Sequence, residues 1–228
     1  MKKATLDALL DARINRRALV LVTAVDGSRE DIIFEDEFDK GYELASELGE
    51  CFRTGRSRMI EGGSGELFLQ AFLPSPRLMI IGATHIGQVL VRLSREVGIE
   101  PFVVDPRTAF ATEDRFRDVD LIAEWPGEAL GKLGLDRRSA VVCLAHVPDI
   151  DDEALEAALK SDSFYIGALG SGRSHAKRLE RLKERGCEES QFGRIHGPVG
   201  LDIGSVTPPE IALSIAAQAV EALRKGFV

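Results

Sequence analysis

The chain has 228 residues, of which 44% are hydrophobic and 29% charged, and its formal net charge at pH 7 is −8. This length and apolar content suit one large domain or two small ones. The acidic charge excludes DNA and RNA as main partners, and no stretch has the roughly 20 apolar residues that a membrane-spanning helix needs.

The first residues, MKKATLDALLDARINRR, contain two lysines but not the apolar core that a signal peptide requires. We therefore expect a cytoplasmic protein with an amphipathic helix over residues 6–14. The cysteines at positions 51, 143 and 187 form neither a C-x-x-C pair nor a zinc-ligand spacing. Cys143 lies within an apolar run, and we expect it to be a small buried residue.

Residues 1–73 are predicted to form a small α+β domain. Its expected elements are, in chain order, a strand at 18–25, a paired strand at 32–34, a helix at 42–52, and a hairpin made of 58–61 and 67–72 around a glycine turn. The segment Leu73-Pro74-Ser75-Pro76 is the predicted linker, because two prolines at that spacing break both helix and sheet.

Residues 77–228 alternate apolar strands with amphipathic helices, which predicts an α/β domain with a Rossmann-like parallel sheet and helices on both faces. Strands are predicted at 78–81, 102–104, 121–122, 140–145 and 164–168, and helices at 87–97, 152–160, 174–185 and about 208–225. Asp151 is the expected N-cap of the second helix. The last helix begins with the capping box Thr207-Pro208-Pro209-Glu210, and Gly226 is expected to close it.

The segment LMIIGATHIGQVLVRLSREVGIEPFVVDPR, residues 78–107, has the order strand, glycine turn, helix, strand and acid of a dinucleotide-binding βαβ unit. Gly82 permits the tight turn, Gly87 lets the helix pack closely on the strand, and the helix N-terminus offers N–H groups to a phosphate. Asp105 follows about 20 residues after the turn, where such folds place a carboxylate for a ribose hydroxyl. Thr84 replaces the middle glycine of G-x-G-x-x-G, which weakens the prediction of a bound dinucleotide.

Two histidines lie at strand ends that we expect to be neighbours. In the usual strand order, the strands at 78–81 and 140–145 meet at the topological switch point, and their carboxyl ends flank the ligand crevice. His85 and His146 are therefore expected to face one cleft, where each can hydrogen-bond a phosphate, a polar ring or a carboxylate. The alternative is that each caps a loop or a helix. Aspartates follow His146, but we predict no metal site there.

Two later loops supply further candidates. In the strand-to-helix turn that ends at Arg173, the amides around Gly170 and the Ser171 hydroxyl are candidates for an anion nest, and Arg173 for a bidentate phosphate contact. A plain glycine-rich turn with a solvated arginine is the alternative. Residues 194–204 interleave three glycines and a proline with apolar residues, which predicts a structured loop. His196 and Asp202 are its candidate polar contacts in closing the cleft.

Taken in order, the segments GATHIG, VVDPR, TAFATEDRF, AHVPDIDDEAL, YIGALGSGRSHAKRL and GRIHGPVGLDIGSVTPPEIALSIAAQ resemble the XdhC/CoxI family of molybdenum-hydroxylase accessory proteins. The resemblance covers residue 77 to about 221. It implies binding of the molybdenum cofactor, as molybdopterin or its nucleotide form, and delivery to an apo-enzyme such as xanthine dehydrogenase. The expected cofactor-binding residues are Gly82, Thr84, His85, Gly87, Asp105, Arg107, His146, Gly170, Ser171, Arg173, His196 and Asp202.

The sequence also departs from the family pattern. The first motif of the family is typically G-A-G-H-x-G, so Thr84 is a departure beside the retained His85, and the pattern LGS-R-R loses one arginine at residues 169–173. Longer members carry G-S-x-P-R and G-G-C motifs before the linker. Here residues 26–29 are only similar to the first, and Gly62-Gly63-Ser64 has no cysteine. If that cysteine handles sulfur in the family, this chain cannot perform the step in the same way.

Two other functions stay open at this point. One is an NAD(P)-dependent oxidoreductase, although no lysine–tyrosine pair or other proton relay lies at a strand end, and the two tyrosines are Tyr42 and Tyr165. The other is a nucleotide-sensing module with no delivery role. We expect no catalytic residues, and we expect a homodimer only if the N-terminal section exposes an apolar face.

Overall fold

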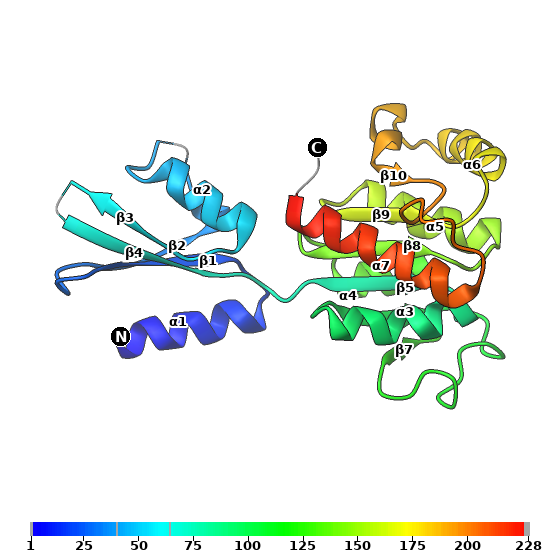
Figure 1. Ribbon diagram of the computed structural model, residues 1–228, viewed down its shortest axis with the longest axis horizontal. Coiled ribbons are helices and arrows are strands. Elements are labelled where there is room, and N and C mark those ends of the chain that lie inside the picture. Colours follow the sequence, from blue (N-terminus) through cyan, green and yellow to red (C-terminus); the bar gives the residue numbers. More distant parts are fainter. Residues whose placement is uncertain (1, 40, 64, 226–228) are drawn as a thin grey trace. The chain divides into compact units, whose positions relative to one another are not determined.

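A computed structural model describes residues 2–39, 41–63 and 65–225 (Figure 1). The chain separates into two compact units, residues 1–74 and 75–228. The boundary falls within the segment 73–76, where Pro74 and Pro76 prevent the backbone from continuing as a regular helix or central strand.

The first unit contains a four-stranded antiparallel sheet in the order β2-β1-β4-β3. Its elements are α1 (Lys3–Ile14), β1 (Leu19–Ala24), β2 (Glu30–Phe34), the short 3-10 helix η1 (Glu35–Glu37), α2 (Ala45–Thr54), β3 (Arg58–Gly62) and β4 (Gly65–Phe72). The predicted pairing of β1 with β2 and the hairpin of β3 with β4 are confirmed. The second helix begins at Ala45, later than predicted, because residues 41–44 form turns.

Helices lie on both faces of this sheet (Figure 1). Leu48, Cys51 and Phe52 of α2 pack into a core with Val20 and Val22 of β1. The helix α1 lies along the other face and leaves three apolar side chains exposed at helical spacing, namely Leu6 (43% exposed), Leu10 (50%) and Ile14 (80%). A homodimer through this face stays a prediction.

The second unit contains a six-stranded sheet in the order β10-β9-β8-β5-β6-β7, in which every neighbouring pair is parallel. The strands are β5 (Arg77–Ile81), β6 (Glu100–Val104), β7 (Asp120–Ile122), β8 (Ser139–Cys143), β9 (Tyr165–Ala168) and β10 (Ile195–His196). The helices are α3 (His85–Glu96), α4 (Pro126–Leu133), α5 (Pro148–Leu159), α6 (Gly172–Glu184), the 3-10 helix η2 (Glu189–Arg194) and α7 (Pro208–Lys225). The Rossmann-like sheet is confirmed, and β5 and β8 are the neighbours expected at its switch point.

Two hydrophobic layers cover the faces of this sheet. On one face, Leu78 and Ile80 of β5 pack with residues of α3 and α7, including Leu90 and Ile215. On the other face, residues 79 and 81 of the same strand pack with α4, α5 and α6. Because both faces are covered, successive residues of β5 are all buried, which explains its uninterrupted apolar sequence.

Several predicted boundaries were wrong. The helix α5 begins at Pro148, which occupies the first helical position, and Val147 is its N-cap. Asp151 therefore lies inside the first turn and is not the N-cap. The helix α3 begins at His85, two residues earlier than predicted. The elements α4 and β10 were not predicted from the sequence. Two glycines weaken the helical signal of α4, and β10 has only two residues.

Other local predictions are confirmed. At the start of α7, Glu210 Oε2 accepts hydrogen bonds from the N–H groups of Val206 (2.8 Å) and Thr207 (2.9 Å), as a capping box requires. Gly226 lies outside the described residues. Cys143 is fully buried in β8, and all three cysteines are free thiols. Among the helices that the structure describes, none has the length and apolar character to cross a membrane.

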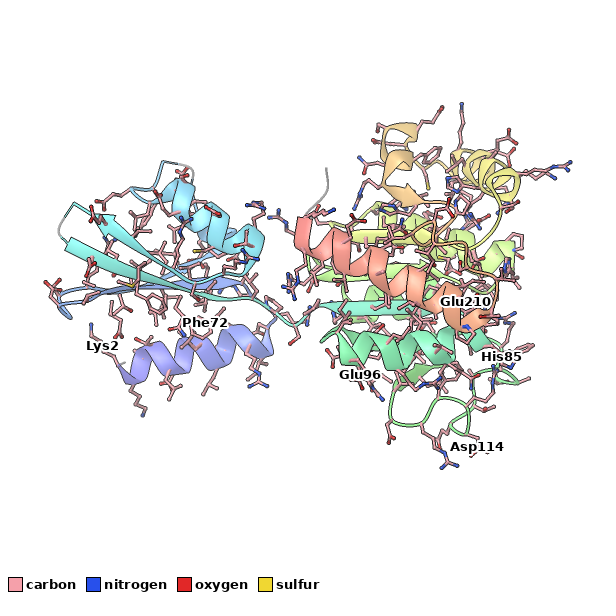
Figure 2. The ribbon with its side chains drawn as sticks, in the orientation of Figure 1. Lys2, Phe72, His85, Glu96, Asp114 and Glu210 are labelled. Carbon is pink, nitrogen blue, oxygen red and sulfur yellow. The ribbon has the colours of Figure 1, made fainter. Side chains whose placement is uncertain are left out.

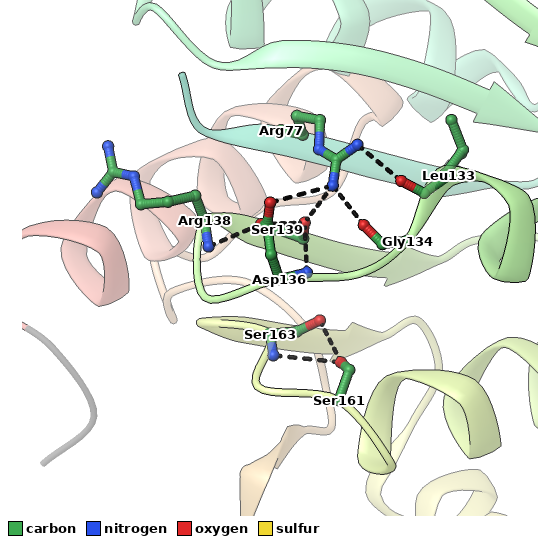
Figure 3. A network of polar contacts seen from close by, with 8 residues as sticks. All are labelled: Arg77, Leu133, Gly134, Asp136, Arg138, Ser139, Ser161 and Ser163. Carbon is green, nitrogen blue, oxygen red and sulfur yellow. Dashed lines mark hydrogen bonds and ion pairs between the residues drawn. The ribbon is translucent and has the colours of Figure 1, made fainter. Parts of the chain in front are cut away.

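The amino edge of the parallel sheet is held by the buried side chain of Arg77 (Figure 3). Its guanidinium donates to the carbonyl oxygens of Leu133 (3.1 Å) and Gly134 (2.6 Å), and to Ser139 Oγ (3.1 Å). It also forms an ion pair with Asp136 at 3.3 Å. These contacts join the starts of β5 and β8, so Arg77 has a structural role; in parallel α/β sheets, ligands bind at the opposite, carboxyl edge.

The first prediction concerns Gly82, at the end of β5. Its φ is +108°, and a Cβ built there would lie 2.6 Å from Ala145 N. The substitution Gly82→Ala should therefore lower the free energy of unfolding by about 2–4 kcal/mol through backbone strain and steric clash. The matched control is Gly131→Ala in α4, where a Cβ meets nothing within 4 Å. It should raise stability by about 0.5–1 kcal/mol, because alanine favours a helix.

Urea unfolding of the three proteins measures both effects. Equal stability of Gly82→Ala and wild type would contradict the close approach of the β5 turn to the end of β8.

Candidate functional site

The carboxyl ends of the parallel strands meet at one edge of the second unit, and the twelve predicted residues lie in the segments that follow them. Gly82, Thr84, His85 and Gly87 follow β5; Asp105 and Arg107 follow β6; His146 follows β8; Gly170, Ser171 and Arg173 follow β9; His196 ends β10, and Asp202 lies in the loop after it. Figure 2 shows His85 and Glu210 at this end of the unit. Neighbouring strands are about 4.8 Å apart, so β5 and β9 are separated by about 10 Å.

In the turn between β5 and α3, backbone N–H groups are already bound by side chains of the protein. Thr84 is the N-cap of α3, and its Oγ1 accepts the N–H of Gly87 at 3.2 Å. A Cβ on Gly87 would lie 3.1 Å from Gly82 O and 3.4 Å from Ile80 Cγ2, which confirms that this glycine permits close packing of helix on strand. The Thr84 hydroxyl thus takes one of the N–H groups that the glycine form of this turn leaves for a phosphate.

Asp105 lies beneath the same turn and is fully buried. Its Oδ2 accepts the N–H of Ala83 (2.7 Å) and Arg107 Nη2 (2.8 Å), while Oδ1 accepts Arg107 Nε and the Arg107 N–H, both at 2.9 Å. Burial raises the pKa of the Asp105 carboxyl, but the hydrogen bonds from Arg107 and Ala83 outweigh it and hold the pKa below its usual value. Asp105 was expected to offer a free carboxylate to a ribose hydroxyl. In the structure both of its oxygens already accept hydrogen bonds from Ala83 or Arg107.

Arg107 is the part of this pair that reaches solvent. Its side chain is 29% exposed, and its guanidinium lies 4.7 Å from the ring centroid of Phe110. The bidentate bond to Asp105 fixes the orientation of the guanidinium. Arg107, and not Asp105, is thus the group that this strand end can offer to a ligand.

His146 follows β8 in a left-handed backbone conformation, with φ of +57°, and its side chain is exposed. Asp151 Oδ1 accepts the N–H of Ala145 at 3.2 Å, and the N–H of His146 also binds this carboxylate. Burial raises the pKa of Asp151 to about 6, and the positive charge of Arg178 opposes the shift. A buried carboxyl thus fixes the backbone that carries His146.

The turn between β9 and α6 lies two strands from β5. Gly170 has a φ of +138°, and Ser171 is the N-cap of α6, with its Oγ accepting the N–H of Ser174 at 3.3 Å. Arg173 is exposed at the second helical position. Arg178, one turn further on, is buried and donates from Nη2 to the carbonyl oxygen of Leu169 at 2.7 Å.

The sequence-based reading missed Arg178, although a signal was available. Arg178 and Leu182, four residues apart, are the buried positions of the otherwise polar helix α6. An arginine in the buried register of an amphipathic helix indicates a partner for its charge within the fold or the ligand.

The remaining candidates lie at and after β10, the outermost strand of the sheet. His196 is half-buried and stacks on Tyr165, with ring centroids 4.9 Å apart, and burial lowers the pKa of the imidazole. The Tyr165 hydroxyl donates to Gln218 Oε1 (2.6 Å), which also accepts the N–H of Gly200 (2.8 Å). These bonds hold the loop after β10 against α7, so the loop is structured, as predicted. Asp202 is exposed, and its role in closing the site stays a prediction.

A broad hollow of about 700 Å³ lies away from these residues, at the amino end of β6. Its lining includes Arg95 but also the acidic residues Glu100, Asp118 and Asp120, whose excess of negative charge disfavours a phosphate-bearing ligand there. Within residues 2–39, 41–63 and 65–225, no three His, Cys, Asp or Glu side chains are grouped so as to hold a metal ion.

The second unit is similar in sequence to known proteins. The family model described as the XdhC Rossmann domain matches residues 78–219, from β5 into α7. The chain is 31% identical over 160 residues to a Bacillus subtilis (strain 168) protein described as a probable xanthine dehydrogenase subunit, covering 70% of this chain and 46% of that protein. It is 29% identical over 151 residues to the molybdenum cofactor insertion chaperone PaoD of Escherichia coli (strain K12), covering 66% and 41%.

The structural comparison covers both units. A crystal structure described as a xanthine dehydrogenase from Bacillus halodurans is similar with a TM-score of 0.68 and 25% identity, over 98% of this chain and 65% of that one. The chain spans less than half the length of the two curated relatives above.

A second prediction follows from the burial of Asp151. Its folded pKa of about 6 lies above the value of 3.8 for an unperturbed aspartate. The contribution of Asp151 to stability is therefore full below about pH 4 and is lost as the pH rises through about 6. The substitution Asp151→Asn keeps an oxygen for the N–H of Ala145 but has no charge. Between pH 4 and pH 7 it should gain on the order of 1–3 kcal/mol of unfolding free energy relative to wild type.

Urea unfolding at several pH values measures this gain, with the exposed Asp162→Asn as the control that should show none. A difference between Asp151→Asn and wild type that does not change with pH would contradict the raised pKa of Asp151 in the folded protein.

Proposed function

The chain belongs to the XdhC family, and on that premise we propose that it binds the molybdenum cofactor and assists maturation of a molybdenum hydroxylase such as xanthine dehydrogenase. The bound form would be molybdopterin or its nucleotide. One relative carries the name of a molybdenum cofactor insertion chaperone and another is described as part of a xanthine dehydrogenase, which supports this role. One observation carries the proposal. At the carboxyl edge of the sheet in the matched domain, His85 and His146 are exposed after two neighbouring strands.

The groups at this edge fit such a cofactor. Exposed imidazoles at His85 and His146 can hydrogen-bond the polar edge of a pterin. The partly exposed guanidinium of Arg107 and the N–H groups at the start of α6 can bind phosphate. When bound, the cofactor supplies the redox chemistry of the client enzyme. The residues of this chain would bind it, orient it and release it.

The structure disfavours the NAD(P)-dependent oxidoreductase. A dinucleotide that crosses the β5 turn needs an open backbone at position 84 and a carboxylate for the ribose. Thr84 here caps α3 with its side chain, and both oxygens of Asp105 are bound inside the fold. These two features remove the contacts on which dinucleotide binding at this turn depends. A nucleotide-sensing module would use the same edge without delivering a cofactor. An experiment that shows no delivery would favour this alternative.

We further propose the cytoplasm as the location and an apo molybdenum hydroxylase as the protein partner. Delivery requires that the cofactor remain accessible while it is held. The exposure of His85, His146 and Arg173 supports this, because the candidate contacts lie at the surface and not in an enclosed cavity.

The third prediction concerns Thr84 and separates the two ligands. Thr84→Gly opens the backbone of the turn and removes the hydroxyl. It should raise the affinity for NAD and NADP, and it should leave unchanged or weaken that for molybdopterin nucleotide, where a lost hydroxyl contact is worth about 0.5–1.5 kcal/mol. Thr84→Ser, which keeps the capping oxygen, is the matched control and should behave as wild type. Calorimetric titration with the three ligands gives the affinities.

Two results would overturn the proposal. Micromolar binding of NAD to the wild type would place the oxidoreductase first. Absence of molybdopterin binding to a folded wild-type protein would remove the cofactor-holding role.

A further inference from the structure

Several helices begin at the carboxyl edge, and each start presents N–H groups that have no acceptor within its helix. They differ in the charge that surrounds those groups. Beneath the start of α3 lies the buried carboxylate of Asp105. The first turn of α5 contains Asp149 and Asp151. The helix α7 starts with Pro208, which has no N–H, and its first turn contains Glu210. An anion is therefore opposed by a carboxylate at each of these three starts.

The start of α6 is different, because its first turn has no acidic residue and the buried group beneath it is the guanidinium of Arg178. The N-cap Ser171 satisfies the N–H of Ser174 with its hydroxyl. The N–H groups of Gly172 and Arg173, at the first two helical positions, have no acceptor within the helix. Residues 171–173 are exposed, so a ligand can reach these two N–H groups.

The buried guanidinium of Arg178 is the second observation at this turn. Arg178 is 5% exposed, and its Nη2 binds the carbonyl oxygen of Leu169 at 2.7 Å. A Cβ built on Gly170 would lie 3.6 Å from the same nitrogen, so the guanidinium lies directly beneath the turn. Within the described part of the chain its Nε has no hydrogen-bond partner, and Nη1 lies 3.4 Å from His175 Nδ1.

Arg178 differs from most buried arginines in its charge balance, because the carboxylate that acts on it, Asp151, is not in direct contact with it. Among the described residues, no ion pair within 4 Å joins it to an aspartate or glutamate. Burial and the charge of Arg178 both lower the pKa of His175, which favours the neutral form of the neighbouring imidazole. Asp151 acts on Arg178 only at longer range, and its carboxylate is bound by the N–H of Ala145.

Arg77, equally buried at the other edge of the sheet, shows the usual arrangement. It has Asp136 at 3.3 Å together with carbonyl and hydroxyl acceptors (Figure 3). A buried charge without such a partner is costly, which points to a counter-charge supplied from outside the chain.

We propose that the β9–α6 turn, residues 170–173, together with Arg178 beneath it, is the subsite for a phosphate or diphosphate group. The N–H groups of Gly172 and Arg173 bind the phosphate oxygens, and Arg178 provides the buried positive charge. The inference rests on the proposed function only in requiring that the ligand carries phosphate. It places that phosphate about 10 Å from the β5 turn, where a dehydrogenase would hold its dinucleotide.

The test uses inorganic pyrophosphate as the probe and the full chain, in a buffer without phosphate or sulfate. Gly172→Pro removes one of the proposed N–H donors and breaks no helical hydrogen bond, because proline is favoured at the first helical position. Ser171 has φ of −78° and ψ of 165°, the extended conformation that a residue before proline adopts, and a Cβ at 172 meets nothing within 4 Å. Gly172→Ala retains the N–H and is the matched control.

Calorimetric titration should show pyrophosphate binding to wild type and to Gly172→Ala with Kd values that agree within about twofold. Gly172→Pro should bind roughly tenfold more weakly or worse, as expected for loss of a hydrogen bond to a charged acceptor, while its Tm stays at or above that of wild type. Arg178→Met should lose the pyrophosphate-dependent rise in Tm, whereas Lys177→Met, which removes the same charge from an exposed neighbour, should retain it.

Equal binding by Gly172→Pro and wild type, or no binding by wild type, would overturn the subsite. If Arg178→Met does not fold, the comparison of Gly172→Pro with Gly172→Ala is sufficient to test the subsite. A wild type that binds molybdopterin nucleotide but not pyrophosphate would refute the subsite and leave the proposed function standing. Binding of pyrophosphate without binding of molybdopterin would do the reverse.

Discussion

The buried carboxylate of Asp105 is the interaction on which the ligand edge of this protein depends. It joins the turn after β5, through the N–H of Ala83, to the guanidinium of Arg107 at the end of β6. Because Asp105 is fully buried, removing Arg107 would leave its charge without a partner, so this pair holds the turn and the end of β6 together. The consequence for function is direct, because the acid that a dehydrogenase would offer to a ribose is used here to build the site.

The second constraint is the alternation of buried charge along the carboxyl edge. Carboxylates lie beneath the starts of α3 and α5, at Asp105 and Asp151, and a guanidinium lies beneath the start of α6, at Arg178. Asp105 and Asp151 offset the positive ends of the α3 and α5 dipoles, whereas Arg178 adds to that of α6, so an anion is favoured most at the third position. With His85 and His146 exposed between them, the edge can bind a polar ring near β5 and β8 and a phosphate near β9. This division is the physical basis of the proposed molybdopterin site and of our prediction that NAD binds weakly.

Much of the fold was predictable from local sequence. The continuous apolar runs indicated a doubly covered parallel sheet, and the position of Gly87 indicated close packing of α3 on β5. Short elements such as β10 and glycine-containing α4 have too weak a signal to be recognised alone. The orientation of Asp105 could not be predicted, because it depends on Arg107 folding back two residues later. Arg178 was missed because its only signal is its place in the buried register of α6, four residues before Leu182, and not a motif.

Deletion of the gene that encodes this chain, followed by assay of a molybdenum hydroxylase in the same cells, is the most direct test of the delivery role. We predict that the hydroxylase polypeptide is made at its normal level but contains little molybdopterin and has little activity. Wild-type protein supplied in trans should restore both. A hydroxylase with its full cofactor content in the deletion strain would contradict the delivery role, even if this chain binds molybdopterin after purification.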